Sequence, residues 1–373
     1  MRARDLGIRL QGDPGPLNAI TDVGGVEVGM VTIVEDSSEP AVAARTGVTA
    51  ILPLGRAGIG VSVPGAVFSL NGNGEITGSH WIQETGAVEG PIMLTNTHAV
   101  GAVHSGVVWW VARNRPDIAA EWLLPVVAET WDGYLNSINE PFVTSAHAGE
   151  AIEAASAGPV AEGSNGGGTG MNCYGFKGGN GTSSRVVEFG GRAYTVGVFL
   201  QANFGDRHEL TINGVPMGDL DVPFPMGDMR WYANDSTATS LPGGAGSVIA
   251  IIATDAPLIP GQCAALARRV PLGLARSGTS GGHFSGDIFL AFSTSNAGAL
   301  DSGFPDGVED LRSLEMVPWN GMDRFYAAVV HAVEEAVLNA LVNNQDMTGR
   351  GGHFSPALPH DLVLKRLSGG YDS

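Results

Sequence analysis

The chain has 373 residues, of which 38 are acidic and 20 basic, so its formal net charge at pH 7 is −18. A surface this acidic repels phosphate groups, which argues against nucleic acid and anionic membranes as partners. The sequence has no uninterrupted apolar run of about 18 residues and no apolar segment of signal-peptide length near Met1. We therefore expect a cytoplasmic protein.

Strands and turns dominate the first part of the chain. Residues 71–75 (Asn-Gly-Asn-Gly-Glu) read as a turn cluster, and apolar positions at helical spacing predict a helix over 99–113, with Asn96 or Thr97 as its N-cap. Short runs rich in β-branched residues predict strands over 26–34, 46–54 and 91–94.

Glu129 stands alone after the apolar run 123–128 and just before Trp131. Its position would let it point into a cavity beside Trp131, whereas a carboxylate at the end of an element is more often solvated. The sequence leaves both interpretations open.

The middle of the chain predicts a β-hairpin. Residues 185–189 and 192–203 flank Gly190-Gly191, a turn signal between two strand-like runs. The second strand ends near Asn203, where a side-chain amide could donate a hydrogen bond to a ligand. Residues 207–240 have no long periodic segment, so we expect an exposed loop.

The stretch 241–255 is a glycine-rich loop followed by the apolar run 248–253, which predicts a strand buried on both faces. Ser247 lies at the junction. If the Gly246–Ser247 bond breaks, the freed α-amine, with a reference pKa near ~7.7–8.0, can take the proton of the hydroxyl as it attacks a carbonyl. Alternatively, Ser247 simply opens a core strand after a flexible loop.

The C-terminal part has helical patterns over 260–276 and over 321–344, the latter with Asn320 as its expected cap, and a strand pattern over 287–293. Strands and helices come in blocks and do not alternate strictly. The order therefore favours a layered α+β sandwich over a doubly wound sheet.

Two short motifs near position 280 contain serine. Gly-Thr-Ser-Gly-Gly at 278–282 nearly matches the G-x-S-x-G nucleophile elbow, but here a helix precedes the serine and a strand follows, the reverse of what that elbow requires. Ser285 and Asp287 lie two residues apart, so in extended chain both side chains share one face. The pair could orient the α-amine of Ser247, or it could be a turn with an acid at the start of a strand.

Several longer segments resemble the DmpA-type aminopeptidases, which include the β-peptidyl aminopeptidases and the L-aminopeptidase/D-esterases. The likeness covers nearly the whole chain. The segments that carry it are NAITDV (18–23), LPVVAET (124–130), PVAEGSNGGGTGM (159–171), FKGGNGTSSR (176–185), VFLQANFGDR (198–207) and IATDAPL (252–258).

This resemblance implies a single domain over 1–373 with the four-layer α–β–β–α sandwich of self-processing N-terminal-nucleophile hydrolases. Cleavage between Gly246 and Ser247 would give a larger subunit (1–246) and a smaller one (247–373), usually assembled as four such pairs. The resemblance implies no metal and no organic cofactor.

Carried over residue by residue, the resemblance assigns the nucleophile to Ser247 and the orienting serine and acid to Ser285 and Asp287. It makes Asn203 the donor to the oxyanion and Glu129 the carboxylate that holds the substrate ammonium. The sequence departs from some relatives at two positions: Asp287 stands where they carry glutamate, and Trp131 stands where they carry tyrosine.

We therefore predict an aminopeptidase that releases N-terminal residues, β- or α-amino acids, from short peptides, amides and esters through an acyl-enzyme on Ser247. Two alternatives remain. An acyltransferase like the ornithine acetyltransferases would use a threonine nucleophile, which Ser247 argues against. A non-catalytic oligomeric scaffold would not be labelled at Ser247 by an acylating inhibitor.

Overall fold

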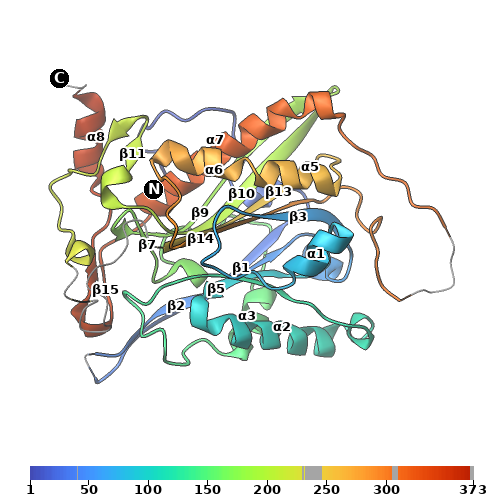
Figure 1. Cartoon of the computed structure of the whole chain (residues 1–373), viewed down its shortest axis with the longest axis horizontal. Coiled ribbons are helices and arrows are strands. Elements are labelled where there is room, and N and C mark those ends of the chain that lie inside the picture. Colours follow the sequence, from blue (N-terminus) through green and yellow to red (C-terminus); the bar gives the residue numbers. More distant parts are fainter. Residues whose placement is uncertain (40, 229–230, 232–245, 305–309, 370–373) are drawn as a thin grey trace.

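The computed structural model describes residues 1–39, 41–228, 231, 246–304 and 310–369. This part of the chain is a mixed α+β fold with two larger sheets and three two-stranded ones, which confirms the expected fold class at that level (Figure 1). The small sheets join β7 (Asn172–Cys173) to β8 (Phe176–Lys177), β11 (Thr211–Ile212) to β12 (Val215–Pro216), and β15 (Met347–Thr348) to β16 (Phe354–Ser355).

The first large sheet has four strands in the order β1-β2-β5-β6. Only the pair β5–β6 is parallel. Its outer face packs against α2 (Val100–Asn114) and α3 (Ser145–Glu153) through a buried apolar cluster. The strands are β1 (Glu27–Asp36), β2 (Ala43–Leu52), β5 (Ile92–Asn96) and β6 (Val126–Thr130).

The second large sheet has six strands in the order β4-β3-β14-β13-β10-β9. Strands β13 and β14 run parallel, and every other neighbouring pair is antiparallel. The strands are β3 (Val63–Ser69), β4 (Ala87–Val88), β9 (Gly179–Phe189), β10 (Arg192–Asn203), β13 (Gly246–Thr254) and β14 (Ser285–Ser293).

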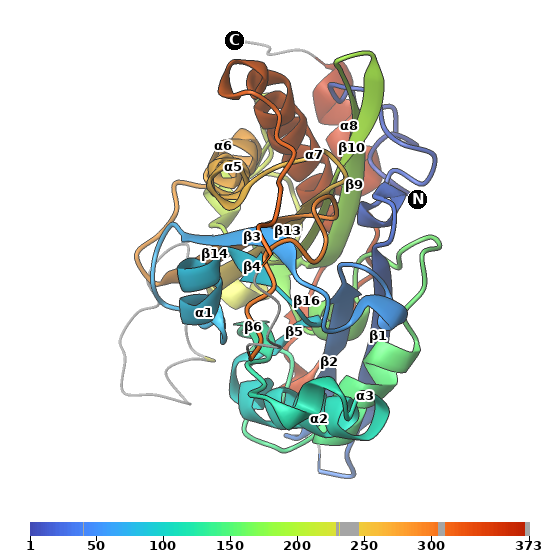
Figure 2. The same ribbon diagram turned by 90° about the vertical axis from the view of Figure 1, so that its right-hand side faces the viewer.

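Helices cover the outer face of the six-stranded sheet, and a second apolar cluster fills the space between the two sheets. Figure 2 shows α2 and α3 on one side of the molecule and the C-terminal helices on the opposite side, with the strands between them. The covering helices are α5 (Pro260–Ala267), α6 (Val270–Leu274), α7 (Asp323–Val342) and α8 (His360–Ser368), whereas α1 (Ser79–Thr85) places its buried residue Ile82 in the cluster between the sheets.

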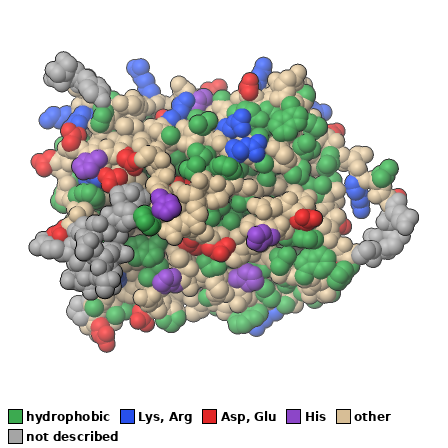
Figure 3. Space-filling model, in the orientation of Figure 1, with side chains coloured by type: hydrophobic (Ala, Val, Ile, Leu, Met, Phe, Trp, Pro, Cys, Tyr) green, Lys and Arg blue, Asp and Glu red, His purple; other side chains and the backbone are tan. Residues whose placement is uncertain are grey.

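Helix α7 is long and apolar enough to cross a membrane, yet 78% of its most apolar window is buried inside the molecule. It packs on β9 and β10 as a core helix. On the face shown in Figure 3, the described Lys and Arg side chains are few, with one small adjoining group near the upper middle and the rest scattered, and they form no continuous basic surface, in keeping with the net charge of −18.

Most predicted elements are confirmed. The strand over 26–34 is β1, the helix over 99–113 is α2, and the Gly190-Gly191 turn joins β9 to β10. Asn96 caps the 3₁₀ turn Thr97–Ala99 that leads directly into α2, because its side chain accepts hydrogen bonds from the backbone N–H groups of His98 and Ala99; α2 itself begins after Ala99 without a side-chain cap. Both cysteines are free and buried.

Three details differ from the sequence-based expectation. The helix predicted over 260–276 is interrupted between α5 and α6, where Pro271 cannot supply the N–H that a continuous helix needs. Asn320 is not a cap: it lies in a 3₁₀ turn, and α7 begins after Met322 without a side-chain cap. The described part of 207–240 is not wholly exposed, because Leu210, Ile212 and Met217 join the core; residues 229–230 and 232–240 lie outside the described residues.

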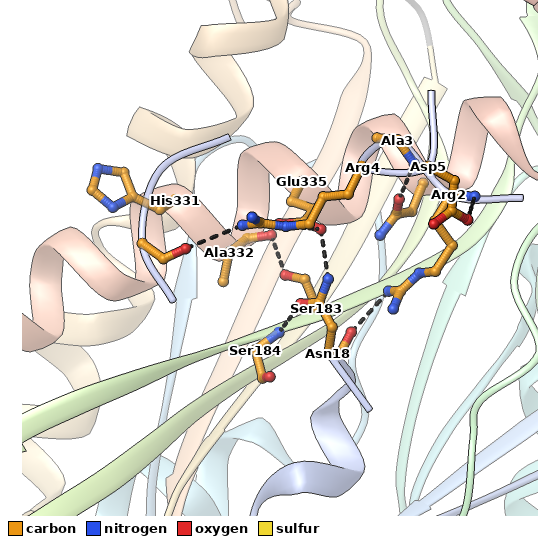
Figure 4. A network of polar contacts seen from close by, with 12 residues as sticks. Arg2, Ala3, Arg4, Asp5, Asn18, Ser183, Ser184, His331, Ala332 and Glu335 are labelled. Carbon is orange, nitrogen blue, oxygen red and sulfur yellow. Dashed lines mark hydrogen bonds and ion pairs between the residues drawn. The ribbon is translucent and has the colours of Figure 1, made fainter. Parts of the chain in front are cut away.

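The N-terminal segment is tied to α7 by a buried polar network (Figure 4). The carboxylate of Glu335 is fully buried and accepts hydrogen bonds from Arg4 (2.9 Å), Arg185 (2.7 Å) and Asn18 (2.6 Å). Burial alone would raise the pKa of Glu335, but these partners outweigh it and hold that pKa below its usual value. The network joins residues before position 246 to a helix after it.

Candidate active site

The site is built around the first residues of β13. This strand lies between β10 and β14, and its register places Ser247 opposite Asn203 on β10 and opposite Gly286 on β14. Ser247 is only 3% exposed. The sheet therefore brings the predicted nucleophile, the predicted oxyanion donor and the Ser285–Asp287 segment to the same end of three neighbouring strands, although they are far apart in sequence.

The hydroxyl of Ser247 lies against the carbonyl group that it would attack in self-cleavage. It donates to the carbonyl oxygen of Gly246 at 2.6 Å and accepts from the backbone N–H of Gly286 at 3.3 Å. A Cβ added to Gly246 would lie 2.1 Å from the carbonyl oxygen of Asn203. Position 246 therefore needs glycine, because the backbone of β10 approaches too closely for a side chain.

Ser285 and Asp287 share one face at the start of β14, as their spacing predicts. The Ser285 hydroxyl donates to Oδ1 of Asp287 at 2.6 Å, so the shorter acid still reaches its serine. Asn71 holds the other side of the carboxylate: its Nδ2 donates to Oδ2 of Asp287 at 2.9 Å, and its Oδ1 accepts from the Asp287 backbone N–H at 2.6 Å. Burial raises the pKa of Asp287, while the bonds from Ser285 and Asn71 oppose that shift.

Glu129 is buried at the end of β6, only 2% exposed, so the interpretation as a solvated carboxylate is wrong. Its Oε1 accepts from the Glu75 backbone N–H at 2.9 Å, and its Oε2 accepts from the Thr97 hydroxyl. Burial raises the pKa of Glu129 despite these donors. A buried carboxylate whose bonds are all from neutral donors is suited to bind a cation.

The turn cluster 71–75 links the two carboxylates of the site. Asn71 binds Asp287 at one end, and the backbone of Glu75 binds Glu129 at the other. Between them, a Cβ added to Gly74 would lie 2.9 Å from the Cα of Gly286, so this loop packs directly on the segment beside Ser247. The loop thereby fixes both acids relative to the nucleophile.

Asn203 has its side-chain amide held at both ends. Its Nδ2 donates to the backbone carbonyl of Trp131 at 2.8 Å, and its Oδ1 accepts from the backbone N–H of Asn172 at 2.9 Å. Trp131 therefore contacts Asn203 through its backbone. Its indole ring packs over Gly133, where an added Cβ would lie 2.3 Å from the ring.

Hydrogen bonding does not connect all the predicted residues directly. Within the described ranges, no hydrogen bond is found from the Ser247 hydroxyl to the side chains of Asn203, Ser285 or Asp287. The register sets Asn203 beside Ser247 on one face of the sheet, whereas Ser285 and Asp287 pair with Gly246 and Val248 and so alternate to the other face, next to the backbone of Ser247. Sequence reasoning missed Asn71, Thr97 and Asn172. The first two had a signal, because Asn71 opens the recognised turn cluster and Thr97 follows the cap Asn96, but no local pattern points to Asn172.

Two other places in the described structure do not belong to this site. The serine of the false elbow, Ser280, donates to the carboxylate of Glu209 and is not near a strand-to-helix turn. A cavity of about 330 Å³ is lined by Trp81, Glu89 and Trp122 among others, and none of the predicted site residues lines it.

Comparison with known proteins assigns the family. The sequence pattern of peptidase family S58 matches residues 18–355. Beta-peptidyl aminopeptidase BapA of Sphingosinicella microcystinivorans is 45% identical over 366 residues, covering 96% of this chain and 90% of the relative. The protein of the same name from Sphingosinicella xenopeptidilytica is 44% identical over 372 residues, covering 98% and 90%. The chain belongs to peptidase family S58.

Solved structures agree with this assignment. The L-aminopeptidase D-Ala-esterase/amidase from Ochrobactrum anthropi, described as a prototype for the serine aminopeptidases and a variant among the Ntn hydrolase fold, has a TM-score of 0.89 at 44% identity, with 99% of each chain covered. The Burkholderia sp. beta-aminopeptidase has a TM-score of 0.88 at 42% identity, with 100% of each chain covered. The chain is a serine aminopeptidase, as the sequence predicted.

The contacts of Asn71 generate a test. Asn71→Ala removes the donor to Oδ2 of Asp287, and a hydrogen bond to a charged group is worth about 1.5–3 kcal/mol, so we expect kcat to fall roughly 10- to 100-fold. Steady-state kinetics on an aminoacyl p-nitroanilide measures this. The matched control is Asn73→Ala in the same loop, whose side chain donates to the Phe284 carbonyl and, among the described residues, makes no hydrogen bond to Asp287. Equal effects of the two variants would show that the loop as a whole matters and the Asp287 contact does not.

Proposed function

We propose that the chain cleaves itself between Gly246 and Ser247, giving subunits 1–246 and 247–373, and that the new N-terminal serine is the nucleophile of the aminopeptidase. The observation that carries this proposal is the Ser247 hydroxyl lying 2.6 Å from the Gly246 carbonyl oxygen, at a position where only glycine fits. In self-cleavage the hydroxyl oxygen adds to the Gly246 carbonyl carbon, the C–N bond breaks, and the resulting ester is hydrolysed by water.

In the mature enzyme, the freed α-amine of Ser247 acts as the base. It takes the hydroxyl proton while the oxygen attacks the substrate carbonyl, and it returns that proton to the leaving group, so that an acyl-enzyme forms and water then hydrolyses it. The amine must be neutral to accept a proton. The Ser285–Asp287 pair, at the edge of the neighbouring strand, is placed to orient this amine and to stabilise its protonated form.

Asn203 and Glu129 bind the two polar parts of the substrate. The amide of Asn203 has two N–H donors, of which one is bonded to Trp131. The other would donate to the oxygen that becomes anionic in the tetrahedral intermediate, an effect worth roughly 2.7–4 kcal/mol for one donor. The buried carboxylate of Glu129 would pair with the free ammonium of the substrate and so select N-terminal residues.

The names of the relatives support a substrate class. They act as β-peptidyl aminopeptidases or as an L-aminopeptidase and D-Ala-esterase/amidase. We propose that this chain likewise releases β- or α-amino acids with a free amine from short peptides, amides and esters, without a metal or organic cofactor.

We also propose a layer order for the fold and an oligomeric state for the enzyme. The arrangement of α2 and α3, the two sheets, and α5 to α7 supports the four-layer α–β–β–α sandwich of the self-processing class. We propose a cytoplasmic homo-oligomer of four processed pairs. Exposed apolar side chains between 311 and 319 support association, since Leu311 is fully exposed and Trp319 is 52% exposed.

Self-processing is tested by intact mass. The purified wild-type protein should consist of two chains with the masses of 1–246 and 247–373, because the Ser247 hydroxyl is positioned for intramolecular attack. Ser247→Ala should remain one chain of 38.4 kDa. Ser280→Ala is the control and should process normally. A fully active wild-type enzyme that persists as one chain would refute the mechanism.

The role of Glu129 is tested by charge removal. Glu129→Gln should lower kcat/KM for a substrate with a free ammonium by about 100-fold or more, since leaving a buried charge without its partner costs about 3–5 kcal/mol. Residual activity on an N-acetylated analogue should change much less. Glu84→Gln serves as the control, because Glu84 is an exposed carboxylate on α1. Equal losses on both substrates would mean that Glu129 supports the fold and does not bind the amine.

A further inference from the structure

One peptide group lies between a buried ammonium and the amide of Asn203. This group joins Met171 to Asn172. Its carbonyl oxygen accepts a hydrogen bond from Nζ of Lys177 at 2.7 Å. Its N–H, which points in the opposite direction within the same peptide plane, donates to Oδ1 of Asn203 at 2.9 Å. Lys177 is completely buried and also donates to the Gly178 carbonyl at 2.8 Å. It is one of only two lysines in the chain, the other being Lys365.

The orientation of the Asn203 amide depends on this peptide group. An asparagine side chain has an oxygen that only accepts and a nitrogen that only donates. Because the Asn172 N–H faces it, the oxygen must lie on that side, and Nδ2 must then point toward the Trp131 carbonyl, at 2.8 Å. A flipped amide would set two donors against each other at one end and two acceptors at the other. Nδ2 of Asn203 can therefore donate to an oxyanion only while the peptide group between Met171 and Asn172 keeps its orientation.

Lys177 is placed to keep that direction. It pairs with Asn172 across the two-stranded sheet β7–β8, and its side chain returns to the carbonyl that precedes Asn172. The backbone N–H of Gly178 also donates to the Met171 oxygen, at 2.9 Å, so this oxygen has one neutral and one ammonium donor. Hydrogen bonds from charged donors are about twice as strong as neutral ones, and polarising a carbonyl strengthens the N–H of the same peptide group.

A buried ammonium is costly in a fold, so its contacts require a reason. Burial lowers the pKa of Lys177 to about 7, and the charge of the buried Asp132 carboxylate opposes this shift. Even when neutral, the Lys177 amine has two N–H donors and can keep its bonds to both carbonyls. Asp132 directly follows Trp131, the residue whose carbonyl holds the other end of the Asn203 amide. Each of the two backbone groups that hold Asn203 thus has a buried ionisable side chain beside it. The Asn172 N–H belongs to the peptide group that Lys177 contacts, and the Trp131 carbonyl directly precedes Asp132.

We propose that Lys177 is a positioning residue for the reaction, which acts through the Met171–Asn172 peptide group to hold the Asn203 amide with its nitrogen toward the reacting carbonyl. This inference rests on the proposed role of Asn203 as the oxyanion donor. Lys177 itself does not touch the nucleophile: the described contacts of its ammonium are with the carbonyls of Met171 and Gly178.

A double-mutant cycle tests the proposal. Lys177→Met keeps the length of the side chain and removes the ammonium. kcat and KM for an aminoacyl p-nitroanilide are measured for the wild type, Lys177→Met, Asn203→Ala and the double variant. Intact mass gives the processed fraction of each protein, and only this fraction is counted as enzyme. Lys365→Met, an exposed position on α8, is the matched control and should behave as the wild type.

We expect Lys177→Met to lower kcat by about 10- to 100-fold, because one oxyanion-hole donor is worth about 10²–10³ in kcat, while KM changes less than about threefold. In the Asn203→Ala background the same substitution should lower kcat less than about threefold, since the group through which Lys177 acts is gone. Equal losses in both backgrounds would overturn the proposal and assign Lys177 a role independent of Asn203.

Two further outcomes are separable. If Asn203→Ala alone leaves kcat unchanged, the proposed role of Asn203 fails, and the inference about Lys177 fails with it. If Lys177→Met does not fold, Lys177→Gln replaces it in the cycle, because a glutamine amide keeps one neutral donor in reach of the carbonyls. A loss of kcat with Lys177→Gln that disappears in the Asn203→Ala background supports the proposal, and one that persists there overturns it.

Discussion

The constraint on which the site depends is the position of β13 between an antiparallel and a parallel neighbour. Its register with β10 sets Ser247 opposite Asn203, and its register with β14 sets Ser247 opposite Gly286. Since side chains alternate along a strand, a shift of one residue in either pairing would turn Ser247 or its partners to the other face. The catalytic geometry is therefore fixed by the backbone ladder before any side-chain contact is made.

Packing secures that register. Both faces of β13 are buried, one in the cluster between the sheets and the other beneath α5, α6 and α7. Across the proposed cleavage point, the buried Glu335 of α7 binds Arg4, Asn18 and Arg185. Removing one partner of a buried ion pair costs about 3–5 kcal/mol. Together with the ladder between β10 and β13, these bonds would keep the two subunits associated after the chain is cut.

The elements around the site were predictable because their signals are local. The apolar run 248–253 indicated a buried strand, Gly190-Gly191 indicated the hairpin, and the spacing of Ser285 and Asp287 placed both on one face. The assignments of Asn203 and Glu129 needed the family resemblance, because a strand-end amide or carboxylate has no distinctive spacing. Glu129 shows the limit best: whether it is solvated or buried depends on Glu75 and Thr97, which approach it from other elements.

Other features could not be predicted from sequence, because they depend on distant chain segments. Asn71 reaches Asp287 across more than two hundred residues of sequence, and Lys177 reaches Asn203 only through the Met171–Asn172 peptide group. The expected cap at Asn320 is wrong although its local signal is favourable. The chain enters α7 through a 3₁₀ turn that contains Asn320, so this residue lies before the helix and does not cap it.

Every role assigned in the site depends on Ser247 being the nucleophile once it is an N-terminus. The most direct measurement is to inactivate the processed enzyme with a sulfonyl fluoride and locate the adduct by peptide mass spectrometry. We expect one adduct per subunit pair, on the N-terminal Ser247 of the smaller chain, with activity lost in proportion to labelling. An adduct on Ser280 or Ser285 that accounts for the loss of activity, with Ser247 unmodified, would contradict it.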